Sequence, residues 1–260
     1  MKRKIGQIGF RIGVLILSFI ILLLLGGCSM ESTFTLTSEQ QEVLRSSGMA
    51  EKRLEAGELR PVEYKMLMAY EEVCRHLSKR YPGQVFTFAG VDNALSPSAN
   101  FTFHYKAGEE RFAVKAICEE GGYENWQVVD SYYSILKKEE LAELVQQTMA
   151  GFGLEAVCDL QMNGWYDESY QPEVLLKDTL STGLKASVFG WVYIREASSL
   201  AEYTAQLEKA LCSSGLCGGF RLVLLNDPAA VLTLGKGKVN QALIAEECYL
   251  SLPDDEGEVR

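Results

Sequence analysis

The spacing of hydrophobic residues predicts two helices in the first third of the chain. Between residues 61 and 80, apolar side chains recur every three or four positions, the period of an amphipathic helix of about five turns. A Tyr-Pro-Gly segment at 81–83 ends this pattern. Earlier in the chain, Thr37 and Gln40 have the spacing of a capping box, which predicts the start of a shorter helix.

Beyond residue 85 the period changes to two, which is the spacing of strands with one buried face. Apolar and polar residues alternate over 101–106 and over 112–118, on either side of an Ala-Gly-Glu-Glu turn, and this predicts a β-hairpin. A strand near 85–89 is expected before it. Further strands are predicted at 126–135, 154–162, 184–195, 220–226 and 248–252, and further helices at 138–152, 172–180 and 199–215.

This order of elements predicts an α+β fold. We expect N-terminal helices followed by small, mostly antiparallel sheets, each with helices packed on one face. Residues 133–160 and 193–224 share the order strand, helix, glycine, strand, which indicates either two β-α-β subdomains or a chance likeness of two amphipathic helices. The expected units are a tether and short helix (28–60), a first α+β unit (61–162), a loop with a short helix (163–183) and a second α+β unit (184–260).

The first 27 residues have the pattern of a secretory signal peptide. Basic residues precede a nearly continuous apolar run over 12–25, and a Gly-Gly-Cys segment ending at Cys28 follows. The run has about 14 residues, whereas a permanent membrane-spanning helix needs about 20. The segment Leu-Gly-Gly-Cys resembles the lipobox of bacterial lipoproteins. That resemblance implies removal of residues 1–27 and attachment of a fatty-acid-bearing diacylglycerol to the sulfur of Cys28.

The same resemblance implies a protein held at the cell membrane by its lipid, on the extracytoplasmic face. The alternative is an uncleaved membrane anchor with an incidental cysteine, and it places the body of the protein on the same side. The order of elements after the lipobox, beginning with a Leu-Thr-x-x-Gln helix start at 36–40, is similar to that of uncharacterised lipoproteins of Gram-positive anaerobes. This likeness implies no particular function.

Charge and composition exclude some classes of function. The 260-residue chain has a formal charge of −10, and four of its basic residues lie in the leader. Nucleic-acid binding needs a basic surface, so we expect no such partner. A hydrophobic content of 47% is too high for a disordered chain and suits one large core or two small ones.

Known catalytic and cofactor motifs are missing from the sequence. The two histidines, His76 and His104, lack partners at metal-ligand spacing and are interpreted as half-exposed surface residues, although a fold can assemble a site from distant positions. There is no G-x-S-x-G segment, and the Gly-Lys-Gly-Lys stretch at 235–238 lacks the pattern of a phosphate loop. We expect no cofactor and no metal.

Six cysteines remain after Cys28. Cys74, Cys118 and Cys158 lie in or beside apolar patterns, which predicts burial. Cys212 and Cys217 are five residues apart across a turn, so they can form a local disulfide, half of a metal site, or free thiols.

Two loops combine aromatic and acidic residues and are the candidate ligand-binding segments. Residues 122–126 include Trp126, and residues 163–170 include Trp165, Tyr166 and Asp167. Aromatic faces beside carboxylates can stack on sugars or hold cationic peptides. In the alternative interpretation, the tryptophans cover the edges of a core and the acids are solvated.

These features favour a non-catalytic lipoprotein that binds a small ligand or an envelope protein near the membrane. One alternative is a cell-envelope hydrolase that uses carboxylates around Asp167, and another is an accessory subunit of a membrane transport or secretion complex. An enzyme predicts a deep cleft with perturbed carboxylates, a binding module an exposed aromatic patch, and a complex subunit a larger apolar face.

Overall fold

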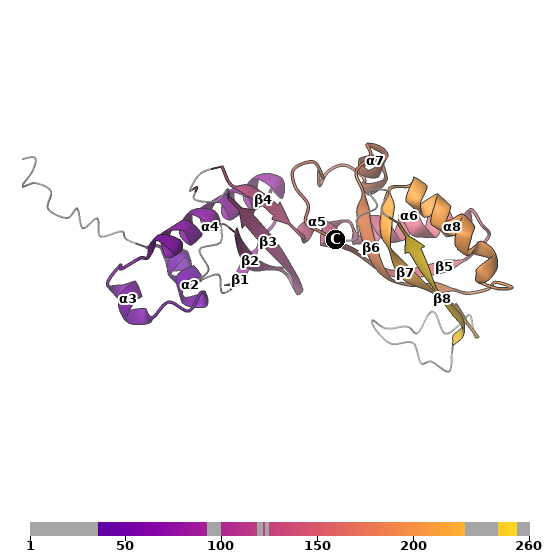
Figure 1. Ribbon diagram of the computed structural model, residues 1–260, viewed down its shortest axis with the longest axis horizontal. Helices are drawn as coiled ribbons and strands as arrows, with labels where there is room; N and C mark the ends of the chain where they lie inside the picture. The colour runs from indigo at the N-terminus through magenta and orange to yellow at the C-terminus, as the bar shows by residue number, and fades with distance from the viewer. Residues whose placement is uncertain (1–35, 93–99, 119–121, 123–124, 227–243, 254–260) are drawn as a thin grey trace, which may run out of the picture.

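Two four-stranded sheets lie one after the other along an elongated molecule, each with helices packed against it (Figure 1). The computed structural model describes residues 36–92, 100–118, 122, 125–226 and 244–253. The predicted leader, Cys28 and the Gly-Lys stretch at 235–238 lie outside these ranges. Among the described residues, no helix combines the length and the apolar character needed to cross a membrane.

The first part of the molecule is a meander of four antiparallel strands covered by one long helix. Its elements are α2 (Ser38–Ser46), α3 (Glu51–Glu55), α4 (Pro61–Arg80), β1 (Thr87–Val91), β2 (Asn100–Ala107), β3 (Glu110–Ile117) and β4 (Gln127–Asp130). The strands pair in sequence order, which leaves β1 and β4 at the edges. The predicted capping box is confirmed, because Thr37 Oγ1 accepts the N–H of Gln40 and the Gln40 side chain accepts the N–H of Thr37.

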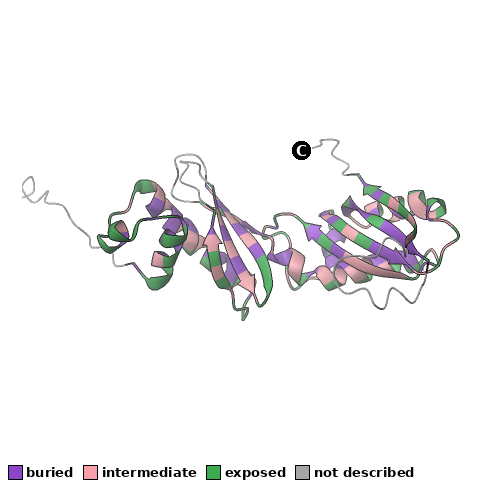
Figure 2. Cartoon of the chain, turned by 90° about the horizontal axis from the view of Figure 1, so that it is seen from below, coloured by how far each residue is buried: buried purple, intermediate pink, exposed green. Residues whose placement is uncertain are grey.

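Aromatic residues fill the core of this first part. Phe101, Phe103 and Tyr105 alternate along β2 and are buried, as the period of two predicts. They pack in the same cluster as Leu67 and Val73 of α4. The alternation of buried and exposed positions along these strands is visible in Figure 2.

The second part has a mixed sheet, and the short helix α5 (Tyr132–Leu136) joins it to the first. Its other elements are α6 (Lys138–Ala150), β5 (Ala156–Asn163), α7 (Leu176–Ser181), β6 (Ala186–Ile194), α8 (Ala201–Ser213), β7 (Leu216–Leu225) and β8 (Ile244–Leu252). The strand order is β5-β6-β7-β8, and only β6 and β7 run parallel, with α8 as their crossover. Apolar residues of α6 and α8 share one buried cluster with the sheet.

The predicted α+β class, with mostly antiparallel sheets, is confirmed. The expected division at residue 162 differs from the arrangement of the sheets, because α6 and β5 belong to the second sheet and its core. Residues 193–224 do form a β-α-β unit. Residues 133–160 do not, because the strand before α6 lies in the other sheet.

The segment predicted as a strand over 126–135 changes to a helix halfway along. The strand β4 ends at Asp130, and α5 begins two residues later. The reason is local: Asp130 Oδ1 accepts the backbone N–H groups of Tyr132 and Tyr133, at 2.9 and 3.2 Å. A carboxylate in this position satisfies the first free N–H groups of a helix and so favours its start.

Candidate functional site

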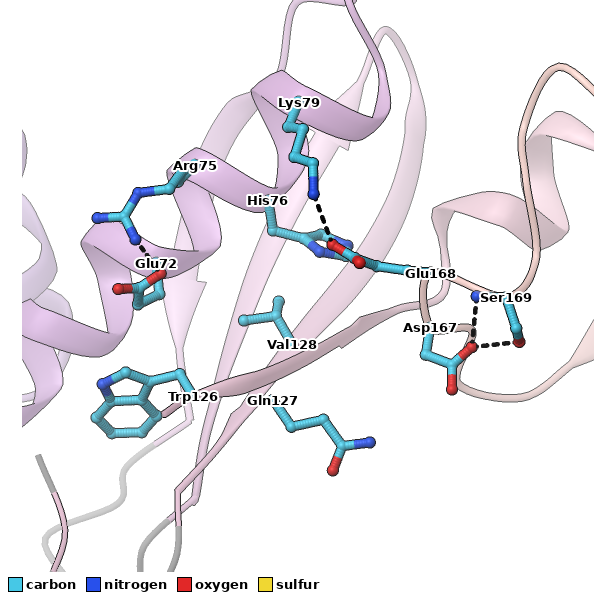
Figure 3. Close-up of a pocket in the computed structure, with 10 residues that line it drawn as sticks. All are labelled: Glu72, Arg75, His76, Lys79, Trp126, Gln127, Val128, Asp167, Glu168 and Ser169. Atoms are coloured by element: carbon cyan, nitrogen blue, oxygen red, sulfur yellow. Dashed lines mark hydrogen bonds and ion pairs between the residues drawn. The ribbon is translucent and has the colours of Figure 1, made fainter. Parts of the chain in front are cut away.

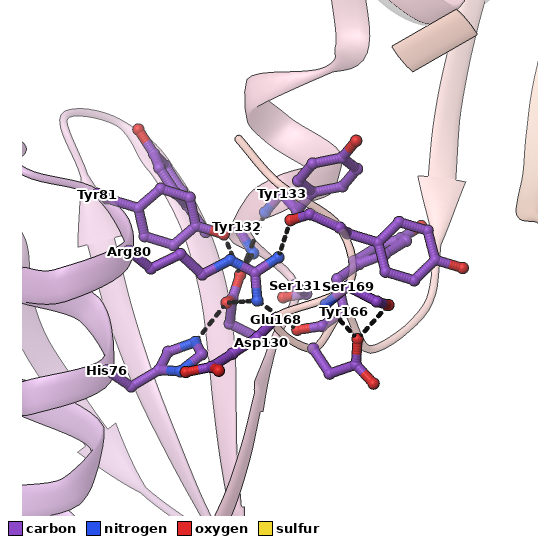
Figure 4. A network of polar contacts seen from close by, with 12 residues as sticks. His76, Arg80, Tyr81, Asp130, Ser131, Tyr132, Tyr133, Tyr166, Glu168 and Ser169 are labelled. Carbon is purple, nitrogen blue, oxygen red and sulfur yellow. Dashed lines mark hydrogen bonds and ion pairs between the residues drawn. The ribbon is translucent and has the colours of Figure 1, made fainter. Parts of the chain in front are cut away.

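The carboxylate of Asp130 is the centre of a buried polar network where the two sheets meet (Figure 4). Its side chain is fully buried. Besides the two N–H groups at the start of α5, Oδ1 accepts the hydroxyl of Tyr81 at 2.8 Å. Burial, followed by the nearby Asp130 charge, raises the pKa of Tyr81, so this hydroxyl stays a hydrogen-bond donor.

The other oxygen of Asp130 faces helix α4. Oδ2 lies 2.9 Å from His76 Nε2 and 3.3 Å from Arg80 Nη1, and both of these side chains are almost completely buried. His76 was expected at the surface, and this expectation is wrong. The helix directs its imidazole inward, where Asp130, 54 residues further along the chain, supplies a partner that no local pattern reveals.

Arg80 connects this network to the second part of the molecule. Its guanidinium donates to the carbonyl oxygens of Tyr166 and Tyr170, at 2.9 and 2.6 Å. Asp130 and Tyr166 also exchange two backbone hydrogen bonds, at 2.9 and 3.1 Å, in an isolated antiparallel bridge. The last turn of α4, the end of β4 and the loop after β5 are therefore fastened together at one point.

A pocket of about 460 Å3 opens beside this junction (Figure 3). Three segments form its walls: one face of α4, the start of β4 with the residue before it, and the loop after Tyr166. The lining residues are Glu72, Arg75, His76, Lys79, Trp126, Gln127, Val128, Asp167, Glu168 and Ser169. The volume lies within the range of about 300–1,000 Å3 that is usual for ligand pockets.

Two carboxylates on the loop side of the pocket are held in their ionised form. The side chain and backbone N–H of Ser169 donate to Asp167 Oδ1, and these bonds lower the pKa of Asp167. The ion pair with Lys79, at 3.1 Å, lowers the pKa of Glu168. Both groups are therefore charged at neutral pH, where they serve as acceptors and not as proton donors.

A second, smaller pocket of about 220 Å3 shares three lining residues with the first: His76, Lys79 and Glu168. The exposed Lys79–Glu168 ion pair thus stands between the two pockets. Exposed ion pairs of this kind contribute only about 0–1 kcal/mol, so the pair opens at little cost. Both pockets are lined by residues of α4 and of the loop after β5.

The structure brings together part of the residues that the sequence marked as candidates. Trp126 and Asp167, from the two aromatic and acidic loops, line the same pocket. Tyr166 is buried with 3% of its surface exposed and contributes through its backbone. Trp165 is 46% exposed and is not among the residues that line the pocket.

Trp126 covers an edge of the first core, as one of the two interpretations expects, and it also lines the pocket. Its indole packs on Phe101, with ring centroids 6.1 Å apart, and Lys65 Nζ lies 5.6 Å from the ring centroid. The ring therefore covers an edge of the first core and also forms a wall of the pocket.

Sequence reasoning missed the α4 wall of the pocket, although the sequence holds a signal for it. Glu72, Arg75, His76 and Lys79 have the spacing i, i+3, i+4 and i+7, which is a polar stripe along one helix face. A stripe of this kind is usually only solvated surface. No local signal distinguishes Arg80, whose partners lie 86 and 90 residues away.

Cys212 and Cys217 are both thiols in the structure and do not form the disulfide considered above. Cys212 packs against the core beneath α8, whereas Cys217 follows Leu216, which points into that core. Cys217 is itself buried, with 7% of its surface exposed. In the ranges that the structure describes, no three His, Cys, Asp or Glu residues are grouped to hold a metal ion.

The burial predicted for three other cysteines is only partly confirmed. Cys118 is buried and Cys158 is half-buried, but Cys74 is exposed. Cys74 follows Val73, which is buried in the core, and one helical step rotates a side chain by about 100° away from its neighbour.

Comparison of the chain with models of protein families, with curated proteins and with solved structures finds no match. The chemistry of the junction pocket is therefore inferred from its own geometry.

Proposed function

We propose that this protein is a membrane-anchored, extracytoplasmic lipoprotein that binds a ligand or partner protein in the junction pocket without catalysing a reaction. The leader and the Leu-Gly-Gly-Cys segment support the anchoring through Cys28. The geometry and charge of the pocket support the binding.

The observation that carries the binding proposal is the state of the acids in and beside the pocket. Asp167 and Glu168 have lowered pKa values, so they do not supply the protonated acid that glycoside hydrolysis needs. Asp130 contacts five groups through its two side-chain oxygens, and it is fully buried. An acid that is occupied in this way and fully buried holds the fold together and is not exposed to a substrate.

The lining of the pocket indicates a ligand of mixed character. The ring of Trp126 offers a flat apolar surface on one side, and the ionised carboxylate of Asp167 lies on the other. Among the residues that the structure describes, the partner of Asp167 is Ser169, which donates to Oδ1, so Oδ2 can accept from a ligand. A ligand with an apolar part and a cationic or hydroxyl-bearing part fits both walls.

Tryptophan fluorescence can test binding in this pocket. The chain has three tryptophans, and the double variant Trp165→Phe/Trp191→Phe keeps only Trp126. We expect a saturable change of its emission with at least one probe from a panel of amino acids, short peptides and N-acetylglucosamine oligomers. The control variant Trp126→Phe/Trp165→Phe keeps only Trp191, which lies away from the pocket, and its emission should not respond. A panel that leaves the Trp126 emission unchanged would contradict the proposal.

Membrane anchoring has a separate test. Cells that express the full chain should incorporate a palmitate analogue into it and keep it in the membrane fraction. The Cys28→Ala variant should lose the label and the retention, because no other residue offers a thiol at the lipobox position. Cys74→Ala is the matched control and should keep both. Persistent labelling of Cys28→Ala would refute lipidation at this residue.

A further inference from the structure

The pocket lies along the open edge of a β-sheet. Strand β4 is the last strand of the first sheet and pairs on one side with β3. The N–H and C=O of Asp130 bond to Tyr166, so they point away from β3. Alternate residues of a strand direct their backbone groups to the same side, so those of Val128 face this open edge too. Among the described residues, the backbone of Val128 has no partner on that side.

The chain itself begins a fifth strand at this edge and then leaves it. The bridge between Asp130 and Tyr166 is antiparallel, so an ideal continuation would set residue 168 opposite Val128. Instead the chain turns, because Asp167 Oδ1 accepts the N–H of Ser169 and the carbonyl oxygen of Asp167 accepts the N–H of Tyr170. The space that this turn leaves beside Gln127 and Val128 is the pocket (Figure 3).

We propose that the pocket takes an extended peptide segment, which adds to β4 as a fifth strand and continues the pairing that Tyr166 begins. This inference rests on the proposed function and names its ligand. Strand addition gains affinity from backbone hydrogen bonds and specificity from alternate side chains. The N–H and C=O of Val128, which have no partner within the described ranges on this side, complement another peptide backbone. A glycan has no such regular ladder of donors and acceptors.

Charge around the edge favours a basic residue in that peptide. Arg75 is paired with Glu72, and Lys79 with Glu168. Among the described ion pairs, Asp167 takes part in none, and it is ionised at neutral pH. A lysine or arginine of the peptide would form an ion pair with Asp167, and an apolar residue would contact Trp126.

The first test uses peptides on the unaltered protein. A positional-scanning library of capped hexapeptides is titrated into the full chain in detergent, up to millimolar concentration. We expect enrichment of β-branched residues and of one basic position. The best peptide is then remade with a single N-methyl group on each backbone nitrogen in turn. Methylation at every second position should weaken binding at least tenfold, and methylation at the positions between should change it less than threefold.

That period of two is the signature of strand addition. N-methylation without a period, or a library with no binder, would overturn the inference. The variant Trp165→Phe/Trp191→Phe, which keeps only Trp126, separates a failure of strand addition from a failure of the proposed function. If its emission responds to N-acetylglucosamine oligomers but to no peptide, the pocket binds a glycan and strand addition is wrong. If its emission responds to nothing, both proposals fail.

Variants of the protein give an independent readout. Val128→Pro removes the outward N–H of an edge strand, a position where proline is tolerated. It should weaken the best peptide at least tenfold, with an unchanged melting temperature. Asp167→Asn should reduce the preference for lysine over glutamine at the basic position at least threefold. Lys115→Gln is the control. Lys115 lies on β3, which pairs with the other edge of β4, so this variant should leave the affinity for the peptide unchanged. If the Val128→Pro variant does not fold, the N-methyl peptide series and the Asp167→Asn variant still test whether the peptide adds to β4 as a strand.

Discussion

Two histidine–aspartate pairs in this protein differ in little but their surroundings. His76 Nε2 lies 2.9 Å from Asp130, and His104 Nε2 lies 2.7 Å from Asp92. In the first pair the side chains are 7% and 0% exposed, and in the second 44% and 62%. The buried pair is part of a network that fastens two sheets and borders the pocket, whereas the exposed pair lies within the first sheet and its flank.

The comparison shows what burial adds to an identical contact. At the surface, water screens the charge of the carboxylate and competes for the hydrogen bond, so the pair contributes little. In the junction, a substitution that removes one member of the network leaves another buried polar group without its hydrogen-bond or ion-pair partner. The exposed His104–Asp92 contact is therefore dispensable for stability. The buried His76–Asp130 contact is needed to hold the two sheets together.

Removal of the buried carboxylate should have the largest effect. Asp130→Ala leaves Arg80 with its charge buried and uncompensated, so we expect the free energy of unfolding to fall by about 3–5 kcal/mol. Asp92→Ala removes the exposed counterpart and should cost less than about 1 kcal/mol. Urea unfolding of the three proteins measures both. Equal losses of unfolding free energy from the two variants would show that burial adds nothing to the contribution of the His76–Asp130 pair.

A third acid sharpens the comparison, because it is buried but its partners are half-exposed. Glu63 is 1% exposed and pairs with Arg53 and Arg60, whose side chains are 31% and 49% exposed. Although burial alone raises the pKa of Glu63, its hydrogen bonds with the two arginines outweigh this and lower the pKa to about 2. Because the pKa is lower in the folded protein, the stabilisation is complete above the unfolded value and is lost as pH falls.

We therefore expect Glu63 to contribute about 3 kcal/mol at pH 7 and progressively less between about pH 5 and pH 2. Urea midpoints measured at pH 7, 4 and 2.5 should fall less steeply for Glu63→Gln than for the unaltered protein. Glu58→Gln, next to this cluster, is a suitable control. Parallel pH profiles for all three proteins would show that the ion pairs of Glu63 with its arginines do not stabilise the fold.

The two candidate tryptophans should differ for the same reason. Trp126 packs on Phe101 at the edge of the first core, whereas Trp165 is 46% exposed. Trp126→Ala should lower the free energy of unfolding by about 2 kcal/mol, and Trp165→Ala by less than about 0.5 kcal/mol. Thermal melts without ligand measure both. A loss from Trp165→Ala as large as that from Trp126→Ala would contradict the assigned environments.

Local patterns predicted much of the fold. The helix over 61–80 and the hairpin over 101–118 were found because their hydrophobic periods are strong and their partners are adjacent in the chain. The capping box at Thr37 was found for the same reason. The start of α8 depends instead on a distant contact, because the N–H of Leu200 bonds to Glu246, 46 residues away.

The candidate site was predictable only in part. Trp126 and Asp167 stood out because aromatic and acidic residues gather in their loops, but nothing in the sequence indicated that the two loops meet. They meet through Asp130 and Arg80, whose contacts span 54 to 90 residues. Neither residue lies in a pattern of its own, so their roles follow only from the folded chain.

Amide hydrogen exchange in the loop after β5 tests the central claim, that the buried junction network builds one wall of the pocket. In the Arg80→Lys variant, the backbone N–H groups of the loop should exchange at least tenfold faster at Tyr166, Ser169 and Tyr170. The reason is that lysine lacks the guanidinium group that donates to two carbonyl oxygens of the loop. In Arg75→Lys, on the same helix but exposed, exchange should not change. Unaltered exchange of the loop in Arg80→Lys would contradict the claim.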